Sequence, residues 1–229
     1  MYTELTHTPG ILYAIAYWIS SMVYCRFLPE RTTGMKRCLL AAFFFVLICA
    51  FMTITDYPPD YLYFLFVTIE ICMLYLFMYL MCDMPPVKTV YYCVRAFILG
   101  EFATSLGWLL YYYSVTHIVA EPSLPFMCAL IAVVYFVVFG INYVLEKRQE
   151  KDARLLQLSR RDIAGAIAIA LSTYTISNIS FAVANTPFSM RYSNEIFIMR
   201  TLTDFGGVIM LLLYHYLIVE VSARTEAEL

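Results

Sequence analysis

Long apolar stretches alternate along the chain with short segments that contain prolines, charges or other polar residues. Each stretch holds about 20 mostly apolar residues, the length that a helix needs to cross the hydrocarbon core of a bilayer. Pro58-Pro59 and Pro85-Pro86 separate neighbouring stretches, because proline cannot continue a helix from its interior. The pattern predicts seven membrane-spanning helices, over residues 11–28, 38–55, 61–82, 90–115, 126–145, 163–184 and 196–219. The predicted fold is therefore an all-α, polytopic membrane helix bundle that forms one domain over residues 1–219.

Composition supports a membrane location. Of the 229 residues, 62% are hydrophobic and 14% are charged, and the mean hydropathy is +0.73. A soluble domain has about 25% charged residues, so this chain has too few to cover a surface that faces water. We therefore expect the lipid bilayer to be its main partner. The seven cysteines are odd in number and form no close pairs, which indicates neither a disulfide framework nor a zinc site.

Basic residues between the predicted helices indicate an orientation. The N-terminal tail and the second and fourth connecting segments contain no Lys or Arg, and the sixth contains Arg191 alone. The other segments hold Arg31, Lys36, Arg37, Lys88, Lys147, Arg148, Lys151, Arg154, Arg160, Arg161 and Arg224. Because Lys and Arg in short loops mark the cytoplasmic side, the pattern predicts an outer N-terminus, a cytoplasmic C-terminus and an odd number of spans.

Six ionisable side chains fall inside the predicted spans. They are Glu70, Arg95, Glu101, Arg200, Asp204 and His215. Such a group is costly in lipid and by default marks a functional site or a buried partner. Arg200 and Asp204 are four residues apart, so they share a helix face and can pair. A clamp that only holds helices together is an equally good interpretation of this pair.

Glu70 and Glu101 lie at similar depth in consecutive antiparallel spans. If both face inward, we expect at least one to be protonated, because burial and a neighbouring like charge disfavour the ionised form. Alternatively, one of them pairs with Arg95 or Arg200. The sequence leaves these alternatives open.

The sixth predicted span is polar for a membrane helix, with alanines and Gly165 in its first half and serines, threonines and Asn178 in its second. Small residues let helices approach closely, and hydroxyl and amide groups form hydrogen bonds across the contact. We expect this span to lie centrally in the bundle beside the seventh span, where Gly206-Gly207 favours close packing or a bend.

Many of the 20 tyrosines lie near the predicted ends of spans. Examples are Tyr57, Tyr61, Tyr91, Tyr92 and residues 111–113. An interfacial aromatic belt is the simpler interpretation, and an aromatic ligand surface on the outer side is the alternative.

The sequence contains no recognisable catalytic chemistry. There is no HExxH motif or glycine-rich phosphate loop, and no serine–histidine or cysteine–histidine set has suggestive spacing. We expect no catalytic residue, metal site or cofactor, and nothing indicates a nucleic-acid partner. These features favour a receptor or a carrier over an enzyme.

The stretch SNISFAVANTPFSMRYSNEIFIMRTLTDFGGVIMLLLYHYLIVEVSARTEAEL, residues 177–229, and the earlier ILYAIAYWISSMVY, residues 11–24, carry a family resemblance. They resemble the N-terminal membrane sensor region of GHKL-type bacterial histidine kinases, which are relatives of the peptide-sensing quorum receptors. The resemblance implies a multi-pass receptor in a bacterial plasma membrane, acting as a homodimer. Its ligand would be extracellular, a small peptide in the better-known relatives, and its last span would signal to a cytoplasmic kinase domain.

This chain departs from those kinases because it contains no phosphoacceptor motif and no ATP-binding residues. After Val219, the sequence EVSARTEAEL favours a helix and has no Gly or Pro to end it. We therefore expect residues 220–229 to begin a cytoplasmic signalling helix, in a chain that stops as though a longer protein had been cut.

The sequence leads to a hypothesis for the site. Ligand binding near the outer ends of the sixth and seventh spans would shift the seventh span, with Asn178, Arg200 and Asp204 as ligand-binding or switch residues. Glu70 and Glu101 would form a buried polar switch. Two rival interpretations are a small-molecule or ion transporter with a path along the buried carboxylates, and a membrane scaffold whose polar groups only hold helices together.

Overall fold

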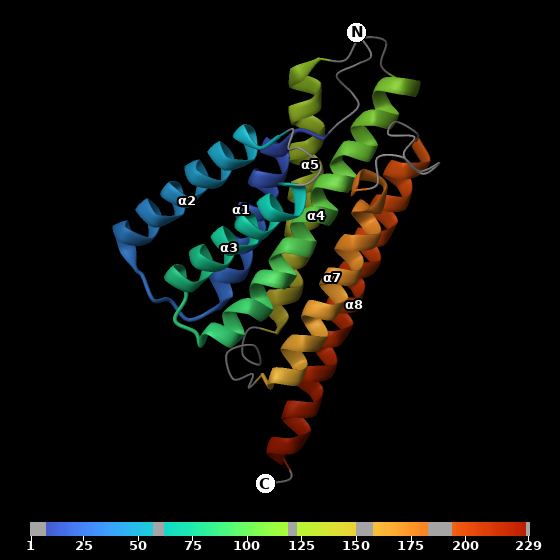
Figure 1. Ribbon diagram of the computed structural model, residues 1–229. Coiled ribbons are helices and arrows are strands. Elements are labelled where there is room, and N and C mark those ends of the chain that lie inside the picture. Colours follow the sequence, from blue (N-terminus) through green and yellow to red (C-terminus); the bar gives the residue numbers. More distant parts are fainter. Residues whose placement is uncertain (1–7, 57–61, 119–122, 150–157, 183–193, 228–229) are drawn as a thin grey trace.

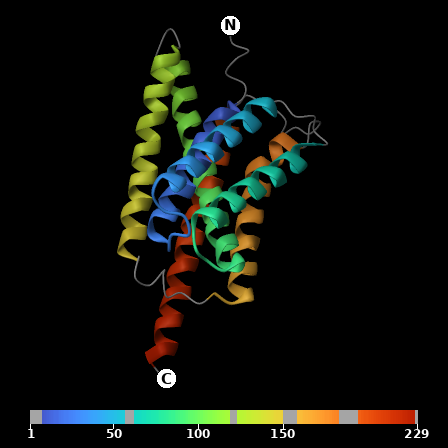
Figure 2. The same cartoon turned by 90° about the vertical axis from the view of Figure 1, so that its left-hand side faces the viewer.

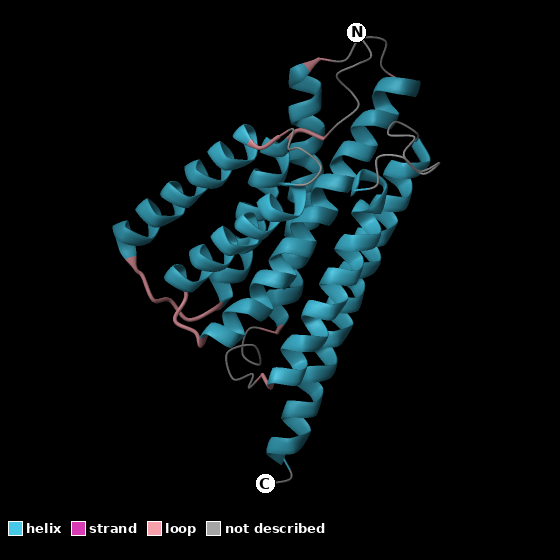
Figure 3. Cartoon of the chain, viewed as in Figure 1, coloured by secondary structure: helices cyan, strands magenta, loops and turns pink. Residues whose placement is uncertain are grey.

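A computed structural model describes residues 8–56, 62–118, 123–149, 158–182 and 194–227. The described residues form seven helices: α1 (Gly10–Phe27), α2 (Gly34–Ile54), α3 (Tyr63–Met81), α4 (Pro86–His117), α5 (Leu124–Arg148), α7 (Arg160–Ala182) and α8 (Asn194–Ala227). Within these ranges every regular element is helical, apart from an isolated bridge between Glu30 and Cys82 (Figure 3). The all-α prediction is therefore confirmed, and each predicted span corresponds to one helix.

The helices begin and end for local reasons. Pro86 stands in the first turn of α4, where a missing N–H costs no hydrogen bond. The Ser123 hydroxyl accepts a hydrogen bond from the Phe126 N–H at the start of α5. At the start of α7, the Asp162 carboxylate accepts a hydrogen bond from the Ser159 N–H at 2.8 Å, and Ser159 Oγ accepts one from the Asp162 N–H at 3.3 Å, as in a capping box. The helices α4 and α8 extend past the predicted spans, and α8 continues without a break to Ala227.

Helix α4 lies at the centre of the bundle (Figures 1 and 2) and packs against α1, α3, α5, α7 and α8. In its most apolar 18-residue window 72% of the residues are buried, against 17% in the corresponding window of α2. The prediction of a central sixth span is wrong in this respect. Helix α7 packs beside α8 as expected, but Leu171 and Ile176 on its other face are 63% and 58% exposed.

The contact between α7 and α8 depends on glycine. A methyl group added at Gly207 would lie 2.4 Å from Thr173 Cγ2, and one added at Gly165 would lie 2.4 Å from the Tyr214 hydroxyl. Space around Gly206 is open. The predicted close packing at the Gly206-Gly207 pair is therefore confirmed for Gly207. On α7, Gly165 lets the helix approach Tyr214 of α8 closely.

Five helices are long and apolar enough to cross a membrane within the described ranges: α2, α3, α4, α5 and the part of α8 from Phe197 to Ser222. Large apolar side chains face outward from them, such as Phe43 on α2 and Phe136 on α5, which are 60% and 81% exposed. An apolar surface of this extent is expected against lipid and not against water. The chain is thus a multi-pass helical membrane protein.

The connection from α1 to α2 and the connection from α3 to α4 pair at one end of the bundle. The Arg31 N–H donates to the Met81 carbonyl at 3.1 Å, and the Asp83 N–H donates to the Pro29 carbonyl at 2.8 Å. An ion pair of 3.5 Å joins the Arg31 and Asp83 side chains. This end is the one from which α8 extends, and it is called here the C-terminal end (Figure 1).

Candidate functional site

A cavity of about 140 Å³ lies between α1, α2, α3, α4, α7 and α8. It is near the opposite end of the bundle, called here the N-terminal end, because Thr8, Gly10 and Asp56 contribute to its lining. Four of the five residues that the sequence analysis selected also line it: Glu70, Glu101, Asn178 and Arg200. The fold therefore brings together residues from four helices that sequence reasoning could only place at similar depths.

An ion pair between α4 and α8 forms one wall of the cavity. Arg200 Nη2 lies 3.0 Å from Glu101 Oε2, and both side chains are buried. The Tyr17 hydroxyl on α1 donates to the other oxygen of the same carboxylate. The Arg200 guanidinium also lies over the Tyr13 ring, 5.3 Å from its centroid. Of the alternatives left open by the sequence, pairing of Glu101 with Arg200 is the one that the structure contains.

Glu70 on α3 lies in the same cavity and is 3% exposed. Its Oε1 atom has no hydrogen-bond partner among the described residues. We define Tyr17, Glu70, Glu101 and Arg200 as the Glu101 cluster. The cluster contains two carboxyl groups and one guanidinium, so Arg200 can neutralise the charge of only one of them.

Asp204 and Asn178 stand at the edge of this cluster. Asp204 lies one turn along α8 from Arg200, is 1% exposed, and accepts a hydrogen bond from Ser105 at 2.6 Å. It does not line the cavity. Asn178 on α7 accepts a hydrogen bond from the Tyr63 hydroxyl at 3.2 Å. The two residues therefore join α8 to α4, and α7 to α3.

Tyrosine contributes more to this site than the sequence indicated. Tyr13 and Tyr17 line the cavity from α1, Tyr63 lines it from α3, and Tyr174 lines it from α7. The Tyr63 and Tyr174 hydroxyls are 2.8 Å apart. None of these four was among the tyrosines singled out at the predicted span ends. What distinguishes these four tyrosines is a hydroxyl group on the buried face of a membrane helix. The sequence does not show which face is buried, because that depends on the rotation of each helix about its axis.

A second buried cluster lies toward the C-terminal end. Arg95 on α4 and Glu146 on α5 form an ion pair of 2.6 Å, and they are 2% and 2% exposed. Aromatic rings surround the Arg95 guanidinium, with the Tyr24, Tyr91 and Tyr92 centroids 5.1, 5.8 and 5.7 Å away. Glu146 was not predicted from the sequence, because it follows the last residue of the fifth predicted span.

His215 on α8 belongs to the same region and is fully buried. Its Nδ1 atom lies 3.0 Å from the Tyr91 hydroxyl on α4. We define Tyr24, Tyr91, Arg95, Glu146 and His215 as the Arg95 cluster. Tyr91 and Tyr92 are 0% and 1% exposed, so the belt interpretation is wrong for these two tyrosines. Tyr57 and Tyr61 lie outside the described residues.

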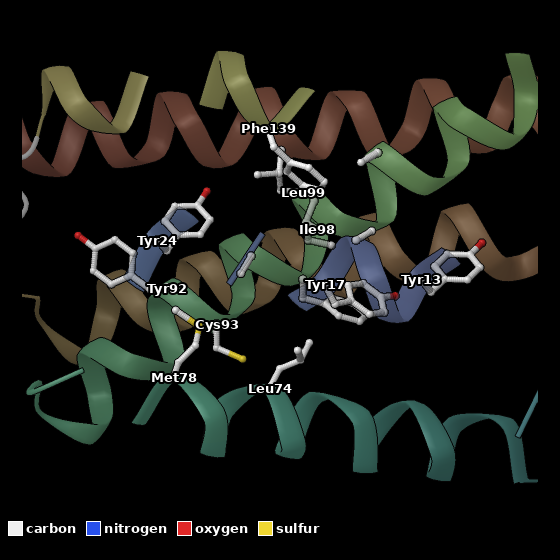
Figure 4. Packing of buried hydrophobic residues seen from close by; sticks show 14 of the residues in the cluster. Tyr13, Tyr17, Tyr24, Leu74, Met78, Tyr92, Cys93, Ile98, Leu99 and Phe139 are labelled. Atoms are coloured by element: carbon white, nitrogen blue, oxygen red, sulfur yellow. The ribbon is translucent and has the colours of Figure 1, made fainter. Parts of the chain in front are cut away.

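A mostly apolar layer separates the two clusters, although the buried Ser20 and Ser21 of α1 also lie between Tyr17 and Tyr24. On α4, the residues between Arg95 and Glu101 are all apolar or glycine and all buried. Ile98, Leu99 and Phe139 lie between the Tyr24–Tyr92 pair and Tyr13 in the packed core (Figure 4). The cavity beside Arg95 is about 10 Å³, which is room for no more than one water molecule. The Glu101 cluster therefore borders a sizeable cavity, whereas the Arg95 cluster is tightly packed.

The residues that the structure describes contain no group of three or more His, Cys, Asp or Glu side chains that could hold a metal ion. No protein-family model, curated protein sequence or solved structure matches the chain. The function must therefore be argued from the two clusters and the cavity.

Proposed function

We propose that this chain is a membrane-embedded sensor whose cavity binds an extracellular signal and whose helix α8 carries the response across the membrane. The observation that carries the proposal is the position of Arg200. It lines the cavity, it forms an ion pair across to α4, and it belongs to the helix that extends furthest from the bundle at the other end. A ligand in the cavity therefore contacts the output helix directly.

The proposed orientation has seven spans, the N-terminus outside and the C-terminus in the cytoplasm. Nine described Lys and Arg residues support it, since all belong to the C-terminal end of the bundle: Arg26, Arg31, Lys36, Arg37, Lys88, Lys147, Arg148, Arg160 and Arg161. Basic residues of this kind mark the cytoplasmic side. The cavity would then face the cell exterior. Arg191 and the Pro58-Pro59 pair lie outside the described residues.

Signal transfer would work through competition for Arg200. In the structure Glu101 holds the Arg200 side chain against α4, and the Arg200 guanidinium lies over the Tyr13 ring of α1. A ligand that binds better when this ion pair is rearranged shifts the equilibrium toward that arrangement. Because α8 is continuous from Asn194 to Ala227, displacement near Arg200 would reach the C-terminal end, where His215 contacts Tyr91.

The resemblance to GHKL-type histidine kinase sensor regions supplies the proposed output. In that setting α8 would act on a cytoplasmic kinase domain in a homodimer, in a bacterial plasma membrane, and residues 220–229 would begin the signalling helix. The ligand class of those relatives, a small peptide, is one candidate for the signal. Asn178, Arg200 and Asp204 would bind or transmit, with Glu70 and Glu101 as the buried switch.

A transporter is the main rival, and the apolar layer between the clusters argues against it in this conformation. A path for ions or solutes requires polar groups or water through the whole depth of the bundle. The rival predicts uptake or current in liposomes that contain the chain alone. The sensor proposal predicts neither.

The experiment joins the chain, after Leu229, to the kinase domain of a GHKL-type histidine kinase and measures basal autophosphorylation in membranes. Arg200→Gln, Asp204→Asn and the double variant are expected to change this activity, because each releases α8 from a contact with α4. Asp83→Asn is the control, since Asp83 is largely exposed and lies at the C-terminal end. Unchanged activity in all three variants would refute the switch role.

A further inference from the structure

The Glu70 carboxylate has no evident structural role in the bundle. It is 3% exposed, it lines the cavity, and its Oε1 atom has no partner in the described part of the chain. A buried carboxyl group with an unpartnered oxygen is costly to ionise, and proteins normally pair it. A partner that arrives from outside would remove this cost, so Glu70 is the kind of group that a ligand completes.

The charges around the cavity indicate the sign of that partner. In the described lining, Asp56, Glu70 and Glu101 contribute carboxylates and Arg200 contributes the guanidinium. Arg200 is already bound to Glu101, and Asp56 accepts a hydrogen bond from the Gly10 N–H at the mouth. The lining thus carries an excess of carboxylate, and a ligand with one positive charge would balance Glu70.

The aromatic lining fits the same ligand. Six rings border the cavity: Tyr13, Tyr17, Phe51, Tyr63, Phe66 and Tyr174. The faces of such rings attract organic cations, most strongly where water is excluded. The hydrogen bonds of the Tyr63 hydroxyl to Tyr174 and Asn178 fix part of this wall. A metal ion would gain little from an aromatic wall, whereas an ammonium group with an apolar body uses both features.

The volume limits the size of the buried part. A cavity of about 150 Å³ takes up one benzene molecule, and this one measures about 140 Å³. It therefore fits an ammonium group that carries one ring or a side chain of similar size. A larger molecule would bind with only that portion inside and the rest toward the mouth near Thr8 and Asp56.

We propose that the cavity is a site for an organic ammonium ion, with the nitrogen against Glu70 and its apolar body among the tyrosine and phenylalanine rings. This inference rests on the proposed sensor function and names the chemical class of its signal. Two sources share this chemistry, a small free amine and the amino terminus of a peptide.

The test uses the purified chain in lipid nanodiscs and measures binding of phenethylammonium by calorimetry. We expect 2-phenylethanol, the neutral analogue, to bind at least about tenfold more weakly. Glu70→Gln should weaken phenethylammonium binding by at least about tenfold while binding of the alcohol is retained. Glu30→Gln is the matched control, because Glu30 lies at the C-terminal end beside Arg37 and should leave binding unchanged.

A second experiment measures binding of the peptide Phe-Gly-Gly-amide, with its N-acetylated form, which has no charged amino terminus, as the neutral analogue. Tighter binding of the free peptide than of phenethylammonium identifies a peptide amino terminus as the source, and the reverse identifies a small amine. The proposal is overturned if the alcohol binds as well as the amine, or if Glu70→Gln binds the amine like the unaltered protein. The Glu70→Gln protein should melt at the same temperature as the unaltered protein or higher without ligand, which shows that it folds. The kinase measurement with the Arg200 and Asp204 variants needs no amine, so it tests the sensor function independently.

Discussion

The Glu101 cluster and the Arg95 cluster contain similar residues but differ in the volume of the cavity beside them. Each contains a buried arginine–carboxylate pair that joins α4 to another helix, and each includes a tyrosine of α1. The Glu101 cluster borders a cavity of about 140 Å³, and the Arg95 cluster borders one of about 10 Å³. The first also holds an extra carboxylate, whereas the second is a closed ion pair within aromatic rings.

This difference suggests a division of roles. The pair in the Arg95 cluster joins α4 to α5, a helix that neither lines the cavity nor carries the proposed output. The pair from α4 to α8 in the Glu101 cluster joins the central helix to the proposed output helix. Removal of one residue of the ion pair in the Arg95 cluster should therefore lower the stability of the protein. Removal of one residue of the ion pair in the Glu101 cluster should mainly change the position of α8.

The largest effect is expected for Glu146→Ala. The substitution leaves the Arg95 guanidinium buried without its carboxylate, and the loss of one partner from a buried ion pair costs about 3–5 kcal/mol. Thermal unfolding in detergent, followed by circular dichroism, would measure it. The double variant Arg95→Met/Glu146→Leu removes both charges and should recover most of the loss. A double variant as unstable as the single one would show that the ion pair is not the cause.

Glu101→Gln should lower the free energy of unfolding by less, about 1–3 kcal/mol. Arg200 keeps the Asp204 carboxylate one turn away and Glu70 in the same cavity, so its charge is not isolated. The same unfolding measurement applies, with Glu70→Gln as the control that should not lower the stability. A loss as large as that of Glu146→Ala would contradict the distinction between the two clusters.

Gly100→Ala tests the contact that connects the Glu101 cluster to the apolar layer. The added methyl would lie 2.5 Å from the Tyr17 ring and 3.3 Å from its Cα, so the ring cannot move away without α1. Overpacking of this kind costs about 1–3 kcal/mol. Gly140→Ala on α5 is the control, because nothing lies within 4 Å of its added methyl. Equal melting temperatures for the two variants would exclude a tight contact at Gly100.

The smallest effect is expected for Tyr91→Phe, which removes the hydrogen bond to His215 but keeps the ring beside Arg95. One such bond contributes about 0.5–1.5 kcal/mol. Tyr113→Phe is the control, since Tyr113 is 47% exposed. The difference between the melting temperatures of the two variants measures how much the Tyr91–His215 hydrogen bond contributes to stability. A shift of the same size in both variants would mean that the Tyr91 hydroxyl has no particular role.

The contrast between the clusters also shows what the sequence could predict. Apolar stretches predicted the positions of all seven helices, because a backbone that crosses lipid must satisfy its hydrogen bonds internally. Glu101 and Arg200 were selected because ionisable groups inside predicted spans are rare. Their pairing stayed undecided, because it depends on how α4 and α8 are rotated about their axes, and this rotation is set by packing among all seven helices.

Glu146 illustrates the corresponding failure. Hydropathy ended the fifth span at Leu145, and Glu146 appeared to begin a solvated charged segment. In the structure α5 continues to Arg148, and Glu146 turns inward to Arg95. The available signal was Arg95 itself, because a buried arginine requires a carboxylate at similar depth. The central position of α4 had a signal of its own, because the mean hydropathy of its most apolar 18-residue window is 1.4, against 2.4 in α2 and 2.6 in α5. A helix that contacts other helices on all sides needs a less apolar surface than one that faces lipid.

The most direct measurement of the central claim is the distance between the C-terminal ends of α8 and α5. Nitroxide labels at Ser222 and Arg148, in a background with Cys38, Cys49, Cys72 and Cys128 replaced by alanine, would report it by pulsed EPR in nanodiscs. The account predicts that Glu101→Gln, which frees Arg200, shifts the mean distance by at least about 2 Å relative to the unaltered protein. Identical distance distributions in the two proteins would contradict the transmission of a signal from the cavity through α8.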